Sequence, residues 1–153
     1  MRLTRHTDYA LRILLQAATQ PDELLSIGAV AEAQGIARNH AMKVVNELAN
    51  AGLLATTRGR SGGFRLGRAA AEITIGEVVR LTETDLRPAD CDSCALQRDC
   101  GLIPVLSGAT RAFLAELDKS TLAQAAATMQ LPPALRSPAR PPADSPASAV
   151  LGN

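Results

Sequence analysis

The sequence predicts a mainly helical fold that carries one small β-hairpin and continues into a long separate helix. Three observations predict it. Apolar residues recur at helical spacing in successive segments between residues 7 and 129. A glycine-rich turn separates two short strand-like runs between residues 53 and 66. Aromatic residues make up only 2% of the chain, so the core must consist of Leu, Ile, Val and Ala, which suits packed helices.

Three helices are predicted in the first 50 residues. The first, over residues 7–19, presents an apolar face formed by Leu11, Leu14, Leu15 and Ala18. Ser26 is expected to cap a second helix over residues 27–34, and Gly35 is expected to end it. The third helix, over residues 38–50, is expected to bury Ala41, Val44, Val45 and Leu48. Two helices joined by a short turn containing glycine form a helix-turn-helix.

A β-hairpin is predicted next, because the runs at 53–57 and 64–66 flank the glycine-rich turn 58–63. A hairpin that directly follows a helix-turn-helix is a wing. Thr74 and Glu77 have the spacing of a capping box and predict a fourth helix that ends near residue 81. Residues 1–82 are therefore expected to form a winged helix-turn-helix domain.

The second half of the chain divides into three segments. Residues 83–101 are irregular and contain every cysteine. Within 102–130, a long helix over 102–117 and a short one over 121–129 are expected, and the long helix carries an apolar stripe of Leu102, Leu106, Ala109, Phe113 and Leu117. This stripe is expected to form a dimer seam, the alternative being that it packs on its own winged-helix domain. Residues 131–153 hold six of the nine prolines and are expected to form a disordered tail.

Several function classes are disfavoured by the sequence. No apolar run approaches the roughly 18 residues of a membrane span, and the N-terminus lacks the apolar stretch of a signal peptide. A cytoplasmic location is expected. An enzyme is not, because no nucleophile and base are paired by spacing and the chain has only two histidines.

Charge is unevenly distributed in a way that favours nucleic-acid binding. Residues 36–68 contain six Lys or Arg against one acid, whereas residues 71–101 contain seven acids against three Arg. This asymmetry is expected when one face meets phosphate. The third helix and the wing supply the expected DNA-binding residues, which are Arg38, Asn39, His40 and Lys43 on the helix and Arg58, Arg60 and Arg65 in the hairpin. The alternative is that these are solvated charges on a winged helix that binds proteins.

Three cysteines within ten residues, Cys91, Cys94 and Cys100, indicate a metal or cluster site. Three thiolates leave a tetrahedral zinc ion or a four-iron cluster one ligand short. The fourth ligand has to come from an exogenous group or from one of Asp8, His6, His40, Asp90, Asp92 and Asp99. An incomplete thiolate set with a labile fourth ligand suits a reactive cluster better than structural zinc.

The ordered succession of motifs is familiar as a whole. It runs through Thr7-Asp8-Tyr9-Ala10-Leu11-Arg12, Ala51-Gly52-Leu53-Leu54, Arg58 to Leu66, Ile73 to Val79 and the three cysteines. It resembles the Rrf2 family of iron–sulfur winged-helix regulators over about residues 1–128, and within that family its nitric-oxide-sensing repressors. The segments Cys94–Leu102 and Ala112–Ala123 carry the closer likeness.

The resemblance implies a homodimer that binds operator DNA and holds a 4Fe–4S cluster on Cys91, Cys94 and Cys100. It also implies that Asp8 serves as fourth ligand to the cluster of the partner subunit, and that nitric oxide releases the DNA. One departure from the family pattern is that two residues, and not five, separate Cys91 from Cys94. A 2Fe–2S cluster is therefore kept as an alternative.

Two other functions are kept as alternatives. The first is a regulator of the same family that responds to iron or to Fe–S status. The second is a zinc-stabilised winged helix that acts as a protein-interaction module, for which DNA binding would be weak and insensitive to salt.

Overall fold

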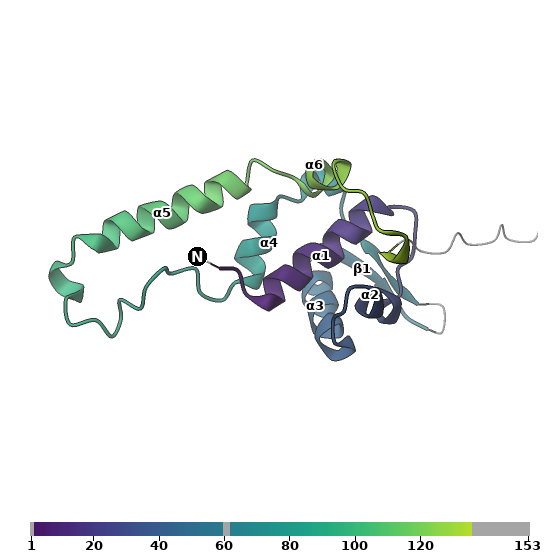
Figure 1. The fold of residues 1–153 in the computed structure, drawn as a ribbon, viewed down its shortest axis with the longest axis horizontal. Coiled ribbons are helices and arrows are strands. Elements are labelled where there is room, and N and C mark those ends of the chain that lie inside the picture. Colours follow the sequence, from purple (N-terminus) through teal and green to yellow (C-terminus); the bar gives the residue numbers. More distant parts are fainter. Residues whose placement is uncertain (1, 60–61, 136–153) are drawn as a thin grey trace, which may run out of the picture.

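The computed structural model describes residues 2–59 and 62–135, and in it a compact body carries one long projecting arm (Figure 1). The body contains the first four helices, the hairpin and the last short helix, and the arm consists of α5 and the segment that leads into it. The elements in chain order are α1 (Arg5–Thr19), α2 (Ile27–Ala33), α3 (Arg38–Asn50), β1 (Leu54–Thr57), β2 (Gly63–Leu66), η1 (Ala70–Glu72), α4 (Ile75–Thr82), η2 (Gln97–Asp99), α5 (Leu102–Leu117), α6 (Leu122–Ala127) and η3 (Pro133–Leu135).

The predicted helix-turn-helix is confirmed as α2 and α3. The Ser26 side chain caps α2, since its hydroxyl accepts from the Ala29 amide. Gly35, at a φ of 65°, makes the turn between the two helices, in a left-handed conformation that glycine adopts without steric cost. Helix α3 begins and ends where its periodicity predicts and buries the four predicted residues, Ala41, Val44, Val45 and Leu48.

The wing is a two-stranded antiparallel sheet in which Leu54 pairs with Leu66 and Thr57 with Gly63. Phe64 connects this sheet to the body. Its side chain is fully buried, and its backbone exchanges two hydrogen bonds with Leu25, of 2.8 and 2.9 Å. The hairpin is therefore joined to the segment before α2 as well as to α3.

The core lies where α1, α3, α4 and the base of the hairpin meet, and α1 supplies much of it. The most deeply buried face of α1 is formed by Ala10, Ile13, Leu14 and Ala17. Of the predicted stripe only Leu14 belongs to this face, because Leu11, Leu15 and Ala18 are half-buried at its edge. The difference arises because α1 is covered from several sides, by α3, α4, α6 and β2, so its buried face is wider than one stripe.

Thr74 caps α4 as predicted, with its hydroxyl accepting from the Glu77 amide at 3.1 Å. The reciprocal half of the capping box does not form. The Glu77 carboxylate instead accepts from the Arg68 guanidinium at 2.5 Å. A complete capping box occurs at α6, where Thr121 and Gln124 satisfy each other's backbone amides.

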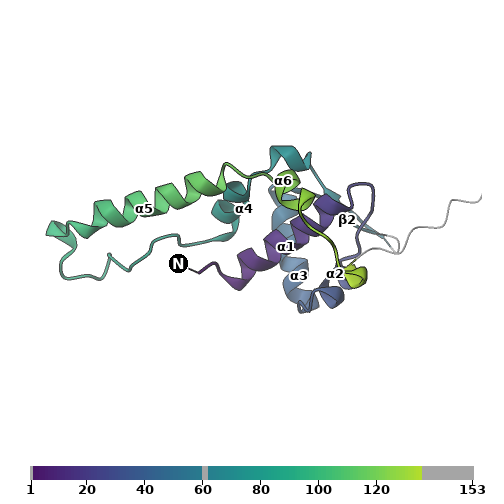
Figure 2. The same cartoon turned by 45° about the horizontal axis from the view of Figure 1, so that its top comes forward.

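Helix α5 leaves the body and makes little contact with it (Figures 1 and 2). All of α5 is described, and none of its residues is buried in the single chain. The alternative prediction, that the apolar stripe of this helix packs on its own winged-helix domain, is therefore wrong. At its C-terminal end, Asp118 accepts two hydrogen bonds of 2.6 Å from Arg80 of α4, which fasten the arm to the body.

The first residues of the segment that was expected to be disordered, 131–135, are packed, and for them the prediction is wrong. Leu131 is buried, and the Leu135 carbonyl accepts from Gln16 Nε2 at 2.8 Å. Residues 131–135 are therefore packed against the body, and residues 136–153 lie outside the described part of the chain.

Within residues 2–59 and 62–135, no helix is both long enough and apolar enough to cross a membrane.

Candidate nucleic-acid interface and cysteine loop

The N-terminal half of α3 presents its polar side chains to solvent. The four residues predicted there, Arg38, Asn39, His40 and Lys43, are all exposed, while the apolar face of the helix is buried in the body. An exposed helix face next to a wing is the arrangement that enters a major groove in helix-turn-helix proteins.

The structure divides the predicted surface into two flanks of α3. Arg38 lies beside the wing, where it lines an open groove together with Asn46, Asn50 and Arg58. His40 and Lys43 lie on the other flank and face α1. The sequence pattern identified the exposed residues but not this division, which depends on what packs on each side of the helix.

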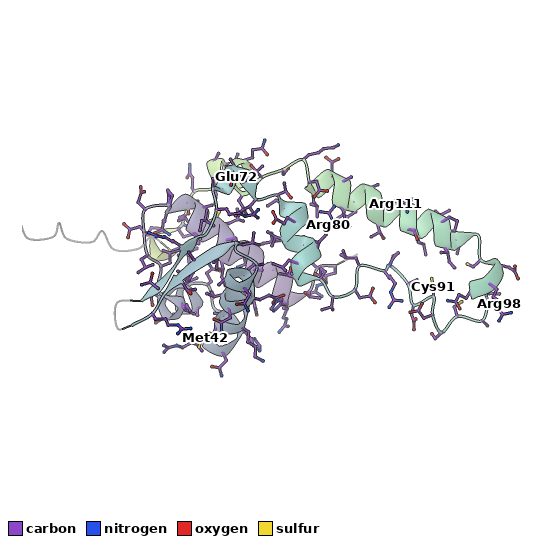
Figure 3. The ribbon with its side chains drawn as sticks, turned by 180° about the vertical axis from the view of Figure 1, so that it is seen from behind. Met42, Glu72, Arg80, Cys91, Arg98 and Arg111 are labelled. Atoms are coloured by element: carbon purple, nitrogen blue, oxygen red, sulfur yellow. The ribbon has the colours of Figure 1, made fainter. Side chains whose placement is uncertain are left out.

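Three further exposed residues of α3 were missed by the prediction. Met42 is 43% exposed, and Asn46 and Asn50 are also exposed. Met42 projects from the outer side of the body in Figure 3. The three recur every four residues on the face that the apolar residues leave free, so the same helical periodicity could have found them. Asparagine amides can pair with adenine, and an apolar side chain can contact a thymine methyl group.

The wing brings two of its predicted arginines to the surface. Arg58 and Arg65 are exposed, and neither forms an ion pair with a residue that the structure describes. Gly59, at a φ of 113°, adopts a conformation that L side chains rarely take and so shapes the turn. Arg60 lies outside the described residues.

The cysteine loop is carried on the arm, away from the body. Figure 3 shows Cys91 and Arg98 at the outer part of the arm, with Arg111 on the helix beside them. All three cysteines are free thiols; Cys94 is exposed, and Cys91 and Cys100 are half-buried.

Local turns hold the cysteine loop together. The Cys94 amide donates to the Cys91 carbonyl at 3.3 Å, and the Cys100 carbonyl accepts from the Ile103 amide at 3.3 Å in the first turn of α5. Within the described part of the chain, no three His, Cys, Asp or Glu side chains are close enough together to hold a metal ion. In this structure the three thiols are therefore not gathered around one point.

Arg87 pairs with two of the acidic side chains around the loop. Arg87 donates to Asp85 at 3.0 Å and also pairs with Asp92. The hydrogen bonds from Arg87 hold the pKa of Asp85 below its usual value, and the Ser93 hydroxyl lowers the pKa of Asp90 in the same way. Two of the candidate fourth ligands, Asp90 and Asp92, are thus already engaged within the loop.

Asp8 lies on the exposed side of α1, in the body and not in the arm. Its carboxylate accepts from Arg12 Nη1 at 3.3 Å. The same guanidinium donates through Nη2 to the Gln34 carbonyl at 2.6 Å, at the turn between α2 and α3. Arg12 therefore links Asp8 to the turn of the helix-turn-helix.

Comparisons with known proteins agree with this geometry. The family Rrf2, described as an iron-dependent transcriptional regulator, matches residues 3–128. The HTH-type transcriptional regulator NsrR of Bacillus subtilis is 47% identical over 128 residues, which cover 80% of this chain and 88% of that protein. NsrR of Bacillus licheniformis is 45% identical over the same length, covering 80% of this chain and 90% of that protein.

Two solved structures share the fold. CymR, the global cysteine regulator of B. subtilis, superposes with a TM-score of 0.70 at 23% identity, covering 85% of this chain and 99% of CymR. IscR of T. potens superposes with a TM-score of 0.68 at 22% identity, covering 86% of this chain and 94% of IscR. The family match extends over the helix-turn-helix, the wing, the cysteine loop and α5 together, and the chain accordingly belongs to the Rrf2 family of transcriptional regulators.

Proposed function

We propose that the chain is a nitric-oxide-responsive iron–sulfur repressor of the NsrR type, which acts in the cytoplasm and binds operator DNA as a cluster-loaded homodimer. The observation that carries the proposal is the presence of three free thiols within ten residues on the arm, in a chain 47% identical to NsrR of B. subtilis. Loss of the cluster to nitric oxide would release the DNA.

The donor set fits an iron–sulfur cluster. Cys91, Cys94 and Cys100 supply three soft thiolate ligands, and the loop that carries them is held by local turns and by side-chain contacts within the loop. Because binding of such a group is coupled to folding of its ligand loop, the cysteines need not be gathered beforehand. When bound, a 4Fe–4S cluster with one oxygen ligand would supply an iron that reacts with nitric oxide.

Asp8 is proposed as that oxygen ligand, provided to the cluster of the partner subunit. Its position on the body, apart from the cysteines of its own chain, supports a role across a dimer. A carboxylate engaged by the partner's iron would bind Arg12 less strongly. Arg12 also holds the Gln34 carbonyl at the turn before α3, so the state of Asp8 would bear on the placement of the recognition helix.

The apolar stripe of α5, none of which is buried in the single chain, is proposed as the dimer seam. Leu102 is 63% exposed in the single chain, and so is Val105 in the same turn. Exposed apolar surface of this extent on an isolated helix marks an interaction site. A two-fold dimer would also present two recognition helices to the two half-sites of an operator.

Base reading and backbone contact are proposed for seven residues. Arg38, Asn39, His40 and Lys43 on α3 and Arg58 and Arg65 in the wing are exposed, which supports the proposal, and Arg60 is included on its place in the hairpin sequence.

The first experiment is anaerobic purification of the full chain, followed by visible spectroscopy and iron and sulfide analysis. The expected result is a coloured protein with about four irons and four sulfides per chain, as a 4Fe–4S cluster requires. Nitric oxide should bleach the cluster and release a labelled operator fragment. A colourless protein with stoichiometric zinc would overturn the proposal.

A regulator of iron or Fe–S status is the second candidate, because the family that matches the chain is described as an iron-dependent transcriptional regulator. This candidate predicts a 2Fe–2S spectrum, or DNA release on iron depletion without a response to nitric oxide. The same spectra and the same nitric oxide titration therefore distinguish a nitric-oxide-responsive repressor from a regulator of iron or Fe–S status.

A further inference from the structure

A small pocket between α1 and α3 gathers residues that the cluster does not use. Its volume is about 270 Å³, and it is lined by Arg5, His6 and Tyr9 from α1 and by His40 and Lys43 from α3. The chain has two histidines and one tyrosine, and all three line this pocket.

The three rings are held in place by specific contacts. The His6 Nε2 atom lies 2.5 Å from Glu47 Oε2, a carboxylate on the next turn of α3. The Tyr9 and His40 rings stack with their centroids 6.5 Å apart and their planes at 30°. The Arg12 guanidinium lies 5.9 Å from the centre of the Tyr9 ring, close enough for a cation–π interaction. The pocket is therefore built from positioned side chains.

The charge of the pocket is positive. Arg5 and Lys43 form no ion pair with any side chain in the described ranges. Among the described residues, Glu47 is the carboxylate that pairs with the lining, through His6, whereas the nearby Asp8 carboxylate accepts from Arg12. Two unpaired cations, two imidazoles and a phenolic hydroxyl line the pocket. Their N–H and O–H groups are only partly occupied by hydrogen bonds within the chain, so they can donate to the oxygens of a phosphate group.

The position of the pocket points to the source of the phosphate. A helix that lies in a major groove has a sugar–phosphate backbone on each side. On one side of α3 lies the groove with Arg58 of the wing, and on the other side lies this pocket. The middle of the exposed face, with Asn39 and Met42, lines neither the groove nor the pocket and is left to meet bases.

We propose that the pocket formed by Arg5, His6, Tyr9, His40 and Lys43 binds a DNA backbone phosphate beside the recognition helix. The proposal rests on the proposed DNA-binding function and refines it. His40 and Lys43 then position the protein on the duplex, and base discrimination is left to other residues of α3. Phosphate contacts of this kind contribute equally to specific and non-specific DNA.

The test compares Arg5→Ala with Lys119→Ala in the full chain, using a duplex of arbitrary sequence. Lys119 is a suitable control because it also removes one positive charge, is highly exposed and lies beyond α5. Affinity is measured over a range of salt concentrations. Arg5→Ala should reduce the salt slope by about 0.9 and the affinity by roughly tenfold near 0.1 M salt. Lys119→Ala should change neither.

A second measurement distinguishes a backbone phosphate of DNA from a free phosphate anion as the ligand of the pocket. Because the chain has one tyrosine and no tryptophan, its intrinsic fluorescence comes from Tyr9 in the pocket. Inorganic phosphate is titrated against chloride at equal ionic strength. Weak quenching or enhancement by phosphate, lost in Arg5→Ala, is expected together with the salt-slope result.

Each other outcome overturns part of the inference. An unchanged salt slope in Arg5→Ala, with steep salt dependence in the unaltered chain, would refute the backbone contact but leave the DNA-binding function intact. If the salt slope is unchanged in Arg5→Ala but inorganic phosphate changes Tyr9 fluorescence in a saturable way, the ligand of the pocket would be a free anion. If the unaltered chain binds no DNA, the proposed function fails first, and a phosphate response at Tyr9 would then again assign the pocket to a free anion.

Discussion

Replacing Phe64 by alanine tests whether the wing is held by the core of the body. Phe64 is fully buried and is the largest side chain in the core. Truncating a buried phenylalanine costs about 3–5 kcal/mol, through lost transfer free energy and the cavity left behind. Domains of this size are stable by only about 5–15 kcal/mol, so a large part of the stability should disappear.

Urea unfolding followed by Tyr9 fluorescence measures this loss, because Tyr9 lies on α1 and packs against the core. With a urea dependence of about 1–3 kcal/mol per molar, the unfolding midpoint should fall by roughly 2 M. The two strands lose their anchor at Leu25 at the same time, so DNA affinity should decrease as well.

Phe113→Ala is the matched control, since the chain has only two phenylalanines and Phe113 lies half-buried on α5. It should change the stability of the body by less than about 0.5 kcal/mol while weakening the proposed homodimer in sedimentation. A loss of under about 1 kcal/mol in Phe64→Ala would contradict the reasoning, because such a cost is typical of a surface position. Equal losses in the two variants would contradict it too.

Three further substitutions test other parts of the molecule. Asp8→Ala should accelerate the loss of absorbance of the proposed cluster under nitric oxide, because one iron loses its proposed protein ligand, and an unchanged rate would exclude Asp8 as a ligand. Gly63→Ala would place a Cβ 2.4 Å from the Leu25 carbonyl oxygen, so the wing must shift; we expect weaker DNA binding without global unfolding, as checked by circular dichroism and a gel-shift titration. Asp118→Asn concerns the arm. Arg80 lowers the pKa of Asp118, so their pairing stabilises the fold above the usual aspartate pKa and is lost as the pH falls through the lowered one. In the variant, the protection factors for hydrogen exchange at the C-terminal end of α5 should be lower at neutral pH and should no longer fall as the pH is lowered; unchanged protection factors would show that the ion pair does not fasten the arm.

The helices were predictable because their signals are local. Ser26 and Thr74 are N-caps whose hydroxyls accept backbone amides three residues on, and this requires nothing from the rest of the chain. Periodicity likewise placed both ends of α3 and of α5. The buried face of α1 was predicted less well, because the partners that cover it come from four other elements.

The element order, the exposed basic residues of α3 and the grouping of three thiols in one loop follow from the amino-acid sequence. Each depends on spacing along the chain or on side-chain chemistry alone. Three other features arise only when the elements pack together: Glu77 pairs with Arg68 and does not complete its capping box, α5 stands away from the body, and His40 and Lys43 face α1. These outcomes depend on which surfaces meet after folding, because a side chain on an exposed face takes its partner from whatever element packs beside it.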